Sequence, residues 1–484
     1  MSSIGFSLRS PFSSLLLCSA PHSTRNPKKP KPFSKFTPKM ALATPTSFGF
    51  SSLLETFTVN VQRAENRPLN VPLTAPFTIA TSRLERVENV AVRVELSNGC
   101  VGWGETPILP FVTAEDQHTA MVKAKEACEF LLRSPAMTLG SVLGEIGGIL
   151  PGHEFASVRA GVEMALIDAV CMSIGVPLWR LFGGASNTIT TDITIPIVSA
   201  AEAATLASKY REEGFKTLKL KVGKNLNSDI EVLRAIRAVH PDCYFILDAN
   251  EGYNSNEAIQ VLDKLHEVGV SPLLFEQPVH RDDWKGLGNV YHVAKDKYGV
   301  SVAADESCRS LADVKKIVEE NLADVINIKL AKVGVVRALE IIEVAKAAGL
   351  NLMMVWLRLD WPWVLLAILL LAWGALSKFV DLDTPLLLSE DPVLEGYEVS
   401  GAVYKFRNAR GHGGFLHWDN IACSLRSLQF NILNSEQHLM AEKKLPRMEL
   451  FQMLSYFFSD ETFEFIDHNS IRHCKRIVNN CLAD

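Results

Sequence analysis

The sequence predicts an α/β protein, a (β/α)₈ barrel with an α+β capping domain on its N-terminal side. Short β-branched or aliphatic runs, separated by helical segments, recur from Thr217 to Lys332. Each run ends in charged residues. An alternating, sheet-like region beginning at Thr56 and then helical periodicity precede them. Repeated strand–helix units predict a parallel barrel, and sheet followed by helices predicts a separate cap.

The charged strand ends recur at a nearly constant interval. Successive members of the series are 27, 28, 29 and 24 residues apart, about the length of one strand–helix unit. The series is Lys221, Asp248, Glu276, Asp305 and Lys329. Charge at strand C-terminal ends is expected at the catalytic face of such a barrel. With Thr188–Pro196 as the first strand, Lys221 and Lys329 end strands two and six and face each other.

Three of these residues are carboxylates on consecutive strands, which suits a hard divalent cation such as Mg²⁺. Any one of them alone is equally well a helix N-cap or an ion-pair partner, but three in series favour a metal site. Strand alternation points Lys219 and Lys221 into the barrel. A lysine there can have a lowered pKa and act as a general base. Two opposed lysines suit removing a proton from one face of a carbon and returning it on the other.

Length and composition limit the other classes of function. The 484 residues suffice for two domains, and 49 basic against 54 acidic residues indicate neither a nucleic-acid nor a membrane partner. The nine cysteines show no CxxC pairing. They are typical of reduced thiols in an intracellular compartment.

Residues 1–50 are rich in Ser, Pro, Lys and Arg, and no acidic residue precedes Glu55. This composition predicts an organelle transit peptide, with the chloroplast as destination. The apolar run Leu15–Cys18 is short for a secretory signal.

The capping domain is predicted over residues 51–185. Ser97-Asn98-Gly99 is a hairpin signal between two strands. Helical periodicity follows at Ala114–Leu132 and Phe155–Ile174. The segment Ala75–Glu85 has no periodicity, and two readings stay open: a loop over the barrel mouth or an ordinary β-connection.

The barrel is predicted over residues 186–383, and residues 384–420 return to the cap. Glycines at 214, 269 and 349 mark the ends of three helices. The predicted barrel helices are Ala200–Glu213, Ser228–His240, Ser255–Val268, Leu311–Asn321 and Val335–Ala348. Residues 421–484 form an atypical tail with weak helical periodicity.

The motifs KLKVG, LDAN, EQP, ADES and NIKLAKVGV together resemble the enolase superfamily, in its muconate-lactonising subgroup. Within it they are most similar to dipeptide epimerases of the L-Ala-D/L-Glu type. The resemblance covers about residues 55–352 and 379–420. It implies Mg²⁺ as cofactor, a dipeptide as substrate, and inversion of an α-carbon by two-lysine 1,1-proton transfer; a homo-oligomer stays open.

The resemblance also implies roles for individual residues. The implied metal ligands are Asp248, Glu276 and Asp305; the acid–base pair is Lys221 and Lys329. Lys219 supports the substrate carboxylate or enolate, and Thr194 contacts the substrate. Asp381 and Asp383 match a DxD motif that holds the substrate's α-ammonium group, which needs anionic partners. Arg83 is placed at the dipeptide's terminal carboxylate.

Three alternatives stay beside this interpretation. Asp381 and Asp383 also fit a loop-capping pair. A cycloisomerase or an o-succinylbenzoate-synthase-like enzyme uses the same metal and lysines, but its substrates carry no ammonium for the DxD pair. The third alternative is a non-catalytic product of a damaged gene.

Residues Met354–Ser377 carry the evidence for damage, because four tryptophans and a leucine run stand where the family has a Gly-rich strand and a small-residue helix. The apolar run is shorter than the ~20 residues of a membrane span. In a shifted frame, codons for Trp356–Trp363 can encode Met-Val-Glu-Thr-Arg-Leu-Ala-Met, which matches the family pattern. The segment is therefore interpreted as frameshifted, with the frame restored before Lys378.

Overall fold

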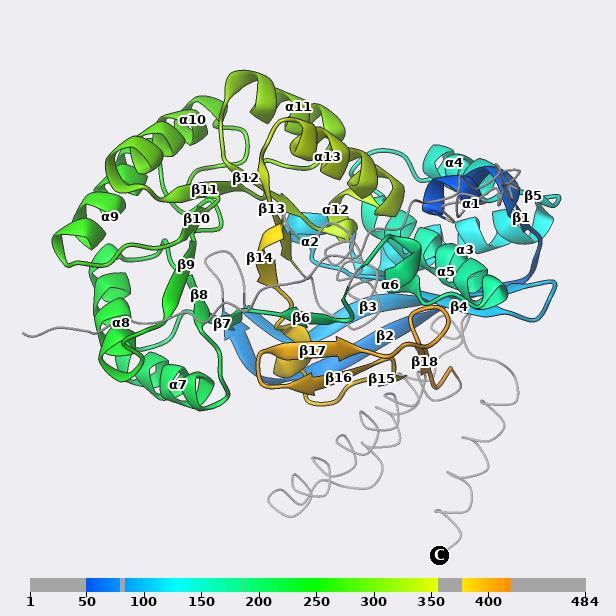
Figure 1. The fold of residues 1–484 in the computed structure, drawn as a ribbon, viewed down its shortest axis with the longest axis horizontal. Helices are drawn as coiled ribbons and strands as arrows, with labels where there is room; N and C mark the ends of the chain where they lie inside the picture. Colours follow the sequence, from blue (N-terminus) through cyan, green and yellow to red (C-terminus); the bar gives the residue numbers. More distant parts are fainter. Residues whose placement is uncertain (1–48, 79–82, 185, 356–376, 419–484) are drawn as a thin grey trace, which may run out of the picture. The chain divides into compact units, whose positions relative to one another are not determined.

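A computed structural model of the chain describes residues 49–78, 83–184, 186–355 and 377–418, all within the compact unit Phe48–Asp484. Eight strands form one parallel sheet in chain order (Figure 1). They are β7 (Ile193–Ile195), β8 (Thr217–Lys221), β9 (Tyr244–Asp248), β10 (Leu274–Glu276), β11 (Ser301–Ala304), β12 (Val325–Ile328), β13 (Asn351–Val355) and β14 (Ser377–Asp381). The backbone N–H of Asp192 donates to the Val380 carbonyl at 2.9 Å, which links the two ends of the sheet. The predicted (β/α)₈ barrel is confirmed.

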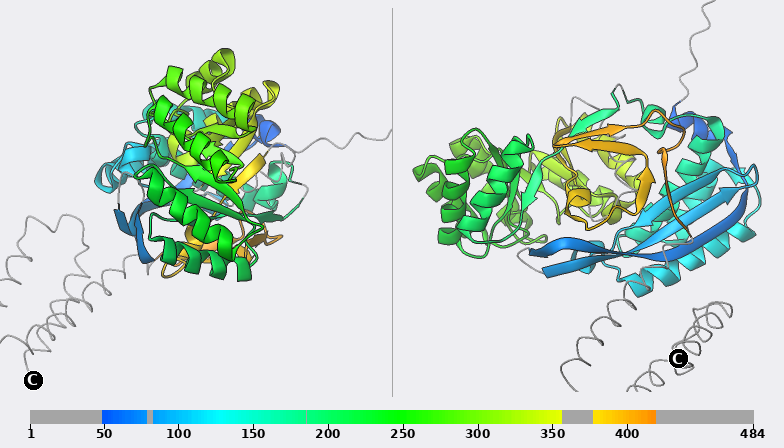
Figure 2. Two further views of the ribbon diagram at one scale, coloured as in Figure 1. Left: turned by 90° about the vertical axis from the view of Figure 1, so that its left-hand side faces the viewer. Right: turned by 90° about the horizontal axis from the view of Figure 1, so that it is seen from below.

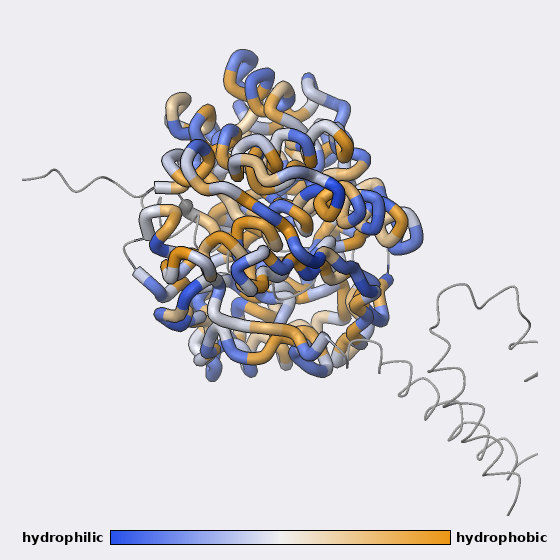
Figure 3. Tube along the Cα trace, turned by 90° about the vertical axis from the view of Figure 1, so that its right-hand side faces the viewer, coloured by the Kyte–Doolittle hydropathy of each residue, from blue (hydrophilic) through white to orange (hydrophobic). Residues whose placement is uncertain are grey.

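Amphipathic helices surround these strands (Figure 1), and Figure 3 shows hydrophilic and hydrophobic residues alternating along the helical turns. They are α7 (Ala200–Glu212), α8 (Leu226–Val239), α9 (Ser255–Glu267), α10 (Trp284–Val293), α11 (Leu311–Glu320) and α13 (Val335–Ala347). Capping boxes at Ser199–Glu202 and Asn254–Glu257 begin α7 and α9. All five predicted helices are present, and positive φ angles at the three predicted glycine stops end their helices.

Helix α10 was not predicted, because two glycines in WKGLGNVYHV lower its helix propensity. Burial of Leu287 and a cap from the Asp283 side chain to the Gly286 N–H stabilise it in the folded protein. A single π-helical stretch, Ala294–Tyr298, continues it. Helix α12 (Leu330–Val333) is a short turn before α13.

The prediction of one first strand over Thr188–Pro196 is wrong. Thr188–Thr190 forms β6, which pairs antiparallel with β17 (Val403–Phe406), and the barrel strand β7 is separate. The chain changes sheets between them, since the Thr191 N–H donates to Ala402 while the Asp192 N–H donates to Val380.

The N-terminal region contains an antiparallel sheet of β2 (Val61–Thr78), β3 (Arg83–Leu96) and β4 (Val101–Thr106), covered by α3 (Gln117–Arg133) and α5 (Ala156–Ile174). The hairpin at residues 97–99 and both predicted helices are present. A Cβ on Gly102 would lie 2.1 Å from the Ala165 carbonyl oxygen, so glycine lets α5 pack directly on β4. Additional elements are α1 (Phe50–Thr56), β1 (Thr58–Val59), α2 (Pro110–Thr113), β5 (Met137–Thr138), α4 (Leu139–Ile149) and α6 (Leu178–Leu181).

The segment Ala75–Glu85 combines both readings of the sequence. Phe77 pairs with Leu84 and Thr78 with Arg83, which extends the β2–β3 hairpin. Its end reaches the barrel, where the Ile197 N–H donates to the Thr78 carbonyl at 3.2 Å (Figure 2). An ordinary hairpin therefore lies at the barrel mouth.

After β14 the chain packs on the cap sheet. The 3₁₀ turn Thr384–Leu387 is followed by β15 (Val393–Glu395), β16 (Tyr397–Ser400), β17 and β18 (Gly414–Leu416). A separate apolar cluster joins this segment to β2 and β3; its buried members are Leu69, Val71, Val87, Ala91, Leu388, Val393 and Leu416.

The expected transit peptide (apart from its last two residues), residues 356–376 of the segment interpreted as frameshifted, and the tail at 421–484 lie outside the described residues. Among the helices that are described, none is long and apolar enough to span a membrane. The described cysteines (Cys100, Cys128, Cys171, Cys243 and Cys308) are free thiols.

Candidate active site at the mouth of the barrel

The structure gathers the five predicted charged strand ends at one mouth of the barrel. Lys221, Asp248 and Glu276 are the last residues of β8, β9 and β10, and the parallel register places them side by side. Asp305 and Lys329 directly follow β11 and β12. All five are buried or nearly so. Residues up to 108 positions apart thus share one site.

The lysines lie between the carboxylates. Lys219 Nζ is 3.0 Å from Asp248 Oδ2, 2.9 Å from Glu276 Oε2 and 2.8 Å from Asp381 Oδ2. Lys221 Nζ is 2.5 Å from Asp248 Oδ2, and Lys329 Nζ is 2.5 Å from Asp305 Oδ2. These ion pairs form two groups: one joins Lys219 and Lys221 to Asp248, Glu276 and Asp381, and the other joins Lys329 to Asp305.

Two residues that hold Asp305 were missed in the sequence. Lys332, only 1% exposed, donates from Nζ to Asp305 Oδ1 and to its carbonyl, each at 2.6 Å. The Gln277 Oε1 accepts from the Asp305 N–H at 2.9 Å, and Gln277 has a φ of 35°, in the left-handed region. A lysine three residues after Lys329, one turn further along the chain, was the available signal for Lys332.

Burial raises the pKa of three carboxyl groups at the site, whereas nearby lysines lower the pKa of a fourth. It raises the pKa of Glu276 to about 8, and Asp248 adds to the shift. Burial and then Asp305 raise the pKa of Glu306 to about 7, and burial and then Asp381 raise that of Asp383 to about 7. At Asp248, burial is outweighed by Lys219, Lys221 and Lys329, which lower the pKa to about 2.

The lowered lysine pKa expected from the sequence is not found at Lys219: burial lowers the pKa, but the charges of Asp248, Asp381 and Glu276 outweigh burial and raise it well above its ordinary value. The same holds at Lys329. Burial alone lowers the pKa of Lys329, but the charges of Asp305, Glu276 and Glu306 outweigh burial and raise it above its ordinary value. The protein groups by themselves therefore keep this lysine protonated. A divalent cation among the carboxylates would offset the negative charge that raises it.

The donor set fits a hard cation. Seven carboxylates at the mouth (Asp192, Asp248, Glu276, Asp305, Glu306, Asp381 and Asp383) face four lysines (Lys219, Lys221, Lys329 and Lys332). The excess of negative charge and the all-oxygen chemistry suit Mg²⁺. Across the described ranges, no three His, Cys, Asp or Glu side chains are already grouped to hold an ion, since lysine Nζ atoms lie between the carboxylates.

A cavity of about 330 Å³ opens over these ion pairs. Its barrel side carries the polar groups, including Thr194, Asp381 and Asp383 together with the three predicted lysines. Its cap side is apolar and is formed by Leu73, Phe77, Leu84, Leu109, Phe111 and Val112. The Arg281 guanidinium, also at the cavity, is paired with the Glu251 carboxylate at 2.5 Å.

The predicted substrate residue Arg83 is not brought to this cavity. Its side chain is 64% exposed and lies 3.9 Å from Glu85. By contrast, Thr194 is buried beside the DxD pair, and its backbone N–H donates to Asp383 Oδ2 at 2.6 Å.

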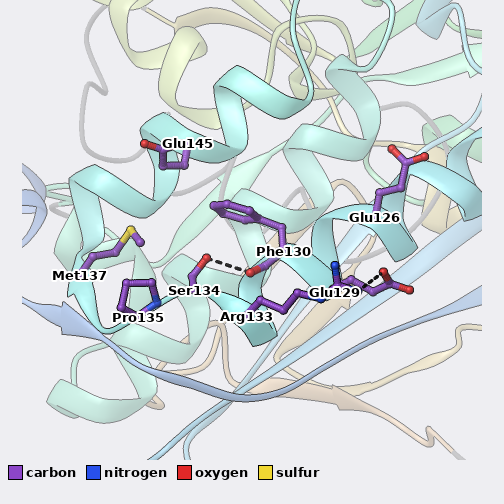
Figure 4. A pocket seen from close by; sticks show the side chains of 8 residues that line it. All are labelled: Glu126, Glu129, Phe130, Arg133, Ser134, Pro135, Met137 and Glu145. Carbon is purple, nitrogen blue, oxygen red and sulfur yellow. Dashed lines mark hydrogen bonds and ion pairs between the residues drawn. The ribbon is translucent and has the colours of Figure 1, made fainter.

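A second pocket, of about 510 Å³, lies on the cap between α3 and α4, and none of the predicted site residues lines it (Figure 4). Two of its three glutamates are already paired, Glu126 with Lys123 and Glu129 with Arg133. The Ser134 hydroxyl donates to the Phe130 carbonyl at 2.8 Å. Most of its charged groups are thus already paired on the surface of α3.

An eight-stranded barrel with opposed lysines, carboxylates on consecutive strand ends and a cap over its mouth defines an enolase-type barrel protein. Two family models match: "Mandelate racemase / muconate lactonizing enzyme, N-terminal domain" over residues 62–183 and "Enolase C-terminal domain-like" over residues 202–419. The L-Ala-D/L-amino acid epimerase of Populus trichocarpa is 70% identical over 415 residues, covering 84% of this chain and 98% of that protein.

Two solved structures extend the comparison. The L-Ala-D/L-Glu epimerase of Bacillus subtilis, solved as a substrate-liganded complex, is 32% identical with a TM-score of 0.69, covering 74% of this chain and 99% of that one. The dipeptide epimerase of Enterococcus faecalis, complexed with Mg and L-Leu-L-Tyr, is 28% identical with a TM-score of 0.66, covering 73% and 99%. The chain belongs to the mandelate racemase/muconate lactonizing enzyme family of the enolase superfamily. It is an isomerase of the epimerase group.

Proposed function

We propose that the chain is a Mg²⁺-dependent dipeptide epimerase that inverts an α-carbon by two-lysine 1,1-proton transfer. The observation that carries the proposal is the cavity at the barrel mouth, which is lined by Lys221 and Lys329 from strands two and six and by the Asp381–Asp383 pair. Relatives that bear epimerase names support the same reaction class.

The DxD pair selects a dipeptide over the substrates of a cycloisomerase or a dehydratase. Asp381 and Asp383 are buried, and both reach the cavity. Buried carboxylates need a positive partner, and a free N-terminal ammonium supplies one. A substrate without an ammonium group would offer no positive partner to the carboxylates of Asp381 and Asp383 on the cavity side.

Asp248, Glu276 and Asp305 would hold Mg²⁺. When bound, the ion supplies Lewis-acid stabilisation of negative charge on the substrate oxygens beside the reacting carbon. In the proton transfer, the neutral amine of one lysine takes the α-proton. The buried Lys219 ammonium stabilises the enolate, and the ammonium of the opposite lysine delivers a proton to the other face. Inversion follows because Lys221 and Lys329 lie on different strands across the barrel.

The cap side of the cavity predicts an apolar second residue in the dipeptide. L-Ala-L-Phe should have a kcat/KM roughly tenfold or more above that of L-Ala-L-Glu, because a carboxylate side chain would be desolvated against Leu84 and Phe77. Steady-state epimerisation of both substrates, followed by polarimetry, gives the ratio. The variant Leu84→Arg should shift the ratio toward L-Ala-L-Glu, and Leu132→Arg, at an exposed position on α3, is its control. Equal kcat/KM values in the unmodified chain would contradict an apolar specificity pocket.

The frameshift interpretation predicts a second effect. β13 and β14, on either side of residues 356–376, both pair in the barrel, so the flanking segments support the family fold. Replacing residues 354–377 by the shifted-frame sequence should raise both soluble yield and epimerase activity by about tenfold or more, because the apolar residues as written would expose hydrophobic surface. Expression and activity are compared with the chain as written. Equal yield and equal activity would leave the frameshift without functional consequence.

The chloroplast is the proposed location, on the composition of residues 1–50 and a plant relative. A dipeptide is the proposed partner.

A further inference from the structure

Three carboxylates meet at the seam where the first and last barrel strands come together. Asp192 directly precedes β7, Asp381 ends β14, and Asp383 follows two residues later. Main-chain bonds hold them there: Asp192 N–H donates to Val380, and Thr194 N–H to Asp383 Oδ2.

The residue between the two DxD carboxylates fixes their direction. Leu382 is fully buried, its N–H donates to Thr191 Oγ1 at 2.7 Å, and its carbonyl accepts from the Tyr404 hydroxyl at 2.8 Å. With Leu382 held in this way, Asp381 and Asp383 both line the cavity. The seam is therefore a built site.

The seam has more negative charge than the protein balances. Asp192, Asp381 and Asp383 are each at least 95% buried. Lys219 is 2.8 Å from Asp381 but also pairs with Asp248 and Glu276. Within the described part of the chain, neither carboxylate oxygen of Asp192 has a hydrogen-bond partner.

Groups on or directly after four elements influence the ionisation of Asp192 and Asp383. Asp192 faces Asp381 and Asp383 at the end of β14, Lys219 on β8 and Glu276 on β10; Tyr210 on α7 faces Asp383. Burial, then Asp381, raises the pKa of Asp192 well above its ordinary value and that of Asp383 to about 7. Three buried carboxylates sharing one ammonium cannot all be ionised, so the cluster retains a proton.

Asp192 lies behind the cavity wall. It and Thr194 are on the same face of the chain by strand alternation, but only Thr194 lines the cavity. Asp192 therefore acts on a ligand through the field at Asp381 and Asp383, as a positioning residue.

We propose that Asp192 is the third carboxylate of the ammonium site and that this cluster loses a proton to solvent when the substrate's ammonium binds. The inference rests on the proposed function. One positive charge replaces another: the O–H bond of one carboxyl group breaks, the proton passes to water or buffer through the cavity, and the carboxylate left behind pairs with the ammonium, with no bond between heavy atoms changed. Because the proton is held by Asp192 together with its neighbours, removing Asp192 should weaken both ammonium binding and its linkage to protons.

Calorimetric titration of the Mg²⁺-saturated full chain tests this at pH 7, in two buffers of different ionisation enthalpy. The ligands are L-Ala-L-Phe and its N-acetyl derivative, which lacks the ammonium. The number of protons released is taken from the difference between the heats in the two buffers. Heat from substrate turnover is the same in both buffers and therefore cancels. We expect L-Ala-L-Phe to release about one proton more than the acetylated ligand. The difference should fall as the pH rises toward 9, because the cluster is then ionised before the ligand binds and because the free amino group of L-Ala-L-Phe, with an ordinary pKa of about 8, itself takes up a proton on binding.

In Asp192→Asn, the difference in proton release between L-Ala-L-Phe and its N-acetyl derivative should be largely lost. The Kd and KM of L-Ala-L-Phe should rise about tenfold, with kcat changed little. Asp192→Ser serves as a second variant if the amide disturbs folding. Asp229→Asn, at a partly buried carboxylate on α8 outside the cavity, is the matched control and should behave as the unmodified chain.

Equal proton release by both ligands, or unchanged release in a folded Asp192 variant, would overturn the inference while leaving the epimerase proposal intact. Failure of the unmodified chain to bind the dipeptide at all would overturn the proposed function, and this inference with it.

Discussion

Lys221→Ala and Lys329→Ala should each lose epimerase activity by on the order of 10³-fold or more, because each removes the only acid–base group assigned to one face of the substrate carbon. Both side chains line the cavity, and each lies 2.5 Å from a candidate metal ligand. Each variant should still exchange the α-proton of one stereoisomer with solvent deuterium, through the remaining lysine. NMR in D₂O with each pure stereoisomer as substrate measures this.

The two variants should differ in which stereoisomer they exchange. Lys224→Ala, at an exposed lysine three residues after Lys221, is the control and should keep full activity. Full epimerisation by either single variant would rule out the two-base scheme. Exchange of the same stereoisomer by both variants would place both lysines on one face.

Magnesium should stabilise the folded chain as well as activate it. The excess of carboxylates at the barrel mouth is relieved by a bound cation, so Mg²⁺ at about 100 times its Kd should add about 2.7 kcal/mol to the free energy of unfolding. Thermal unfolding with Mg²⁺, compared with Na⁺ at equal ionic strength, measures this. Chelation should remove both the shift and the activity.

Glu276→Gln should abolish the Mg²⁺-dependent rise in Tm. Burial and Asp248 raise the pKa of Glu276 to about 8, so glutamine resembles the neutral side chain of the metal-free protein. The variant should therefore fold normally and fail only in binding the ion. Glu145→Gln, in the second pocket on the cap, should keep the full shift. A Mg²⁺ shift that survives in Glu276→Gln would place the ion elsewhere.

Short-range sequence patterns were sufficient to predict most of the strands and helices of the barrel. Aliphatic runs ending in charge located β8 to β12, and glycine stops marked the ends of three of the five predicted helices, since these signals depend on interactions within a few residues. One failure has a local cause and the other does not. Glycines concealed α10, and the division between β6 and β7 depends on two partners, Ala402 and Val380, that are distant in the sequence.

Lys219, Lys221, Lys329 and the three candidate metal ligands could be predicted because a charged residue in an apolar strand is unusual and recurs with the barrel period. Gln277 could not, because it acts on Asp305 from the end of a neighbouring strand. Lys332, which donates to Asp305, was missed although its spacing from Lys329 was a local signal. Arg83, predicted from the resemblance alone, lies in the structure on the exposed side of the hairpin, away from the cavity.

By itself the sequence determined which strands carry charge and in what order, because strand period and burial are local consequences of residue type. The tertiary structure alone decided how those charges are shared. Thr194 and Asp383 meet across 189 residues only when β7 closes on β14. That closure places Asp192 beside the DxD pair, so that Lys219 is the lysine shared by the three buried carboxylates at the seam. The resulting ionisation depends on distances and burial that no local pattern encodes.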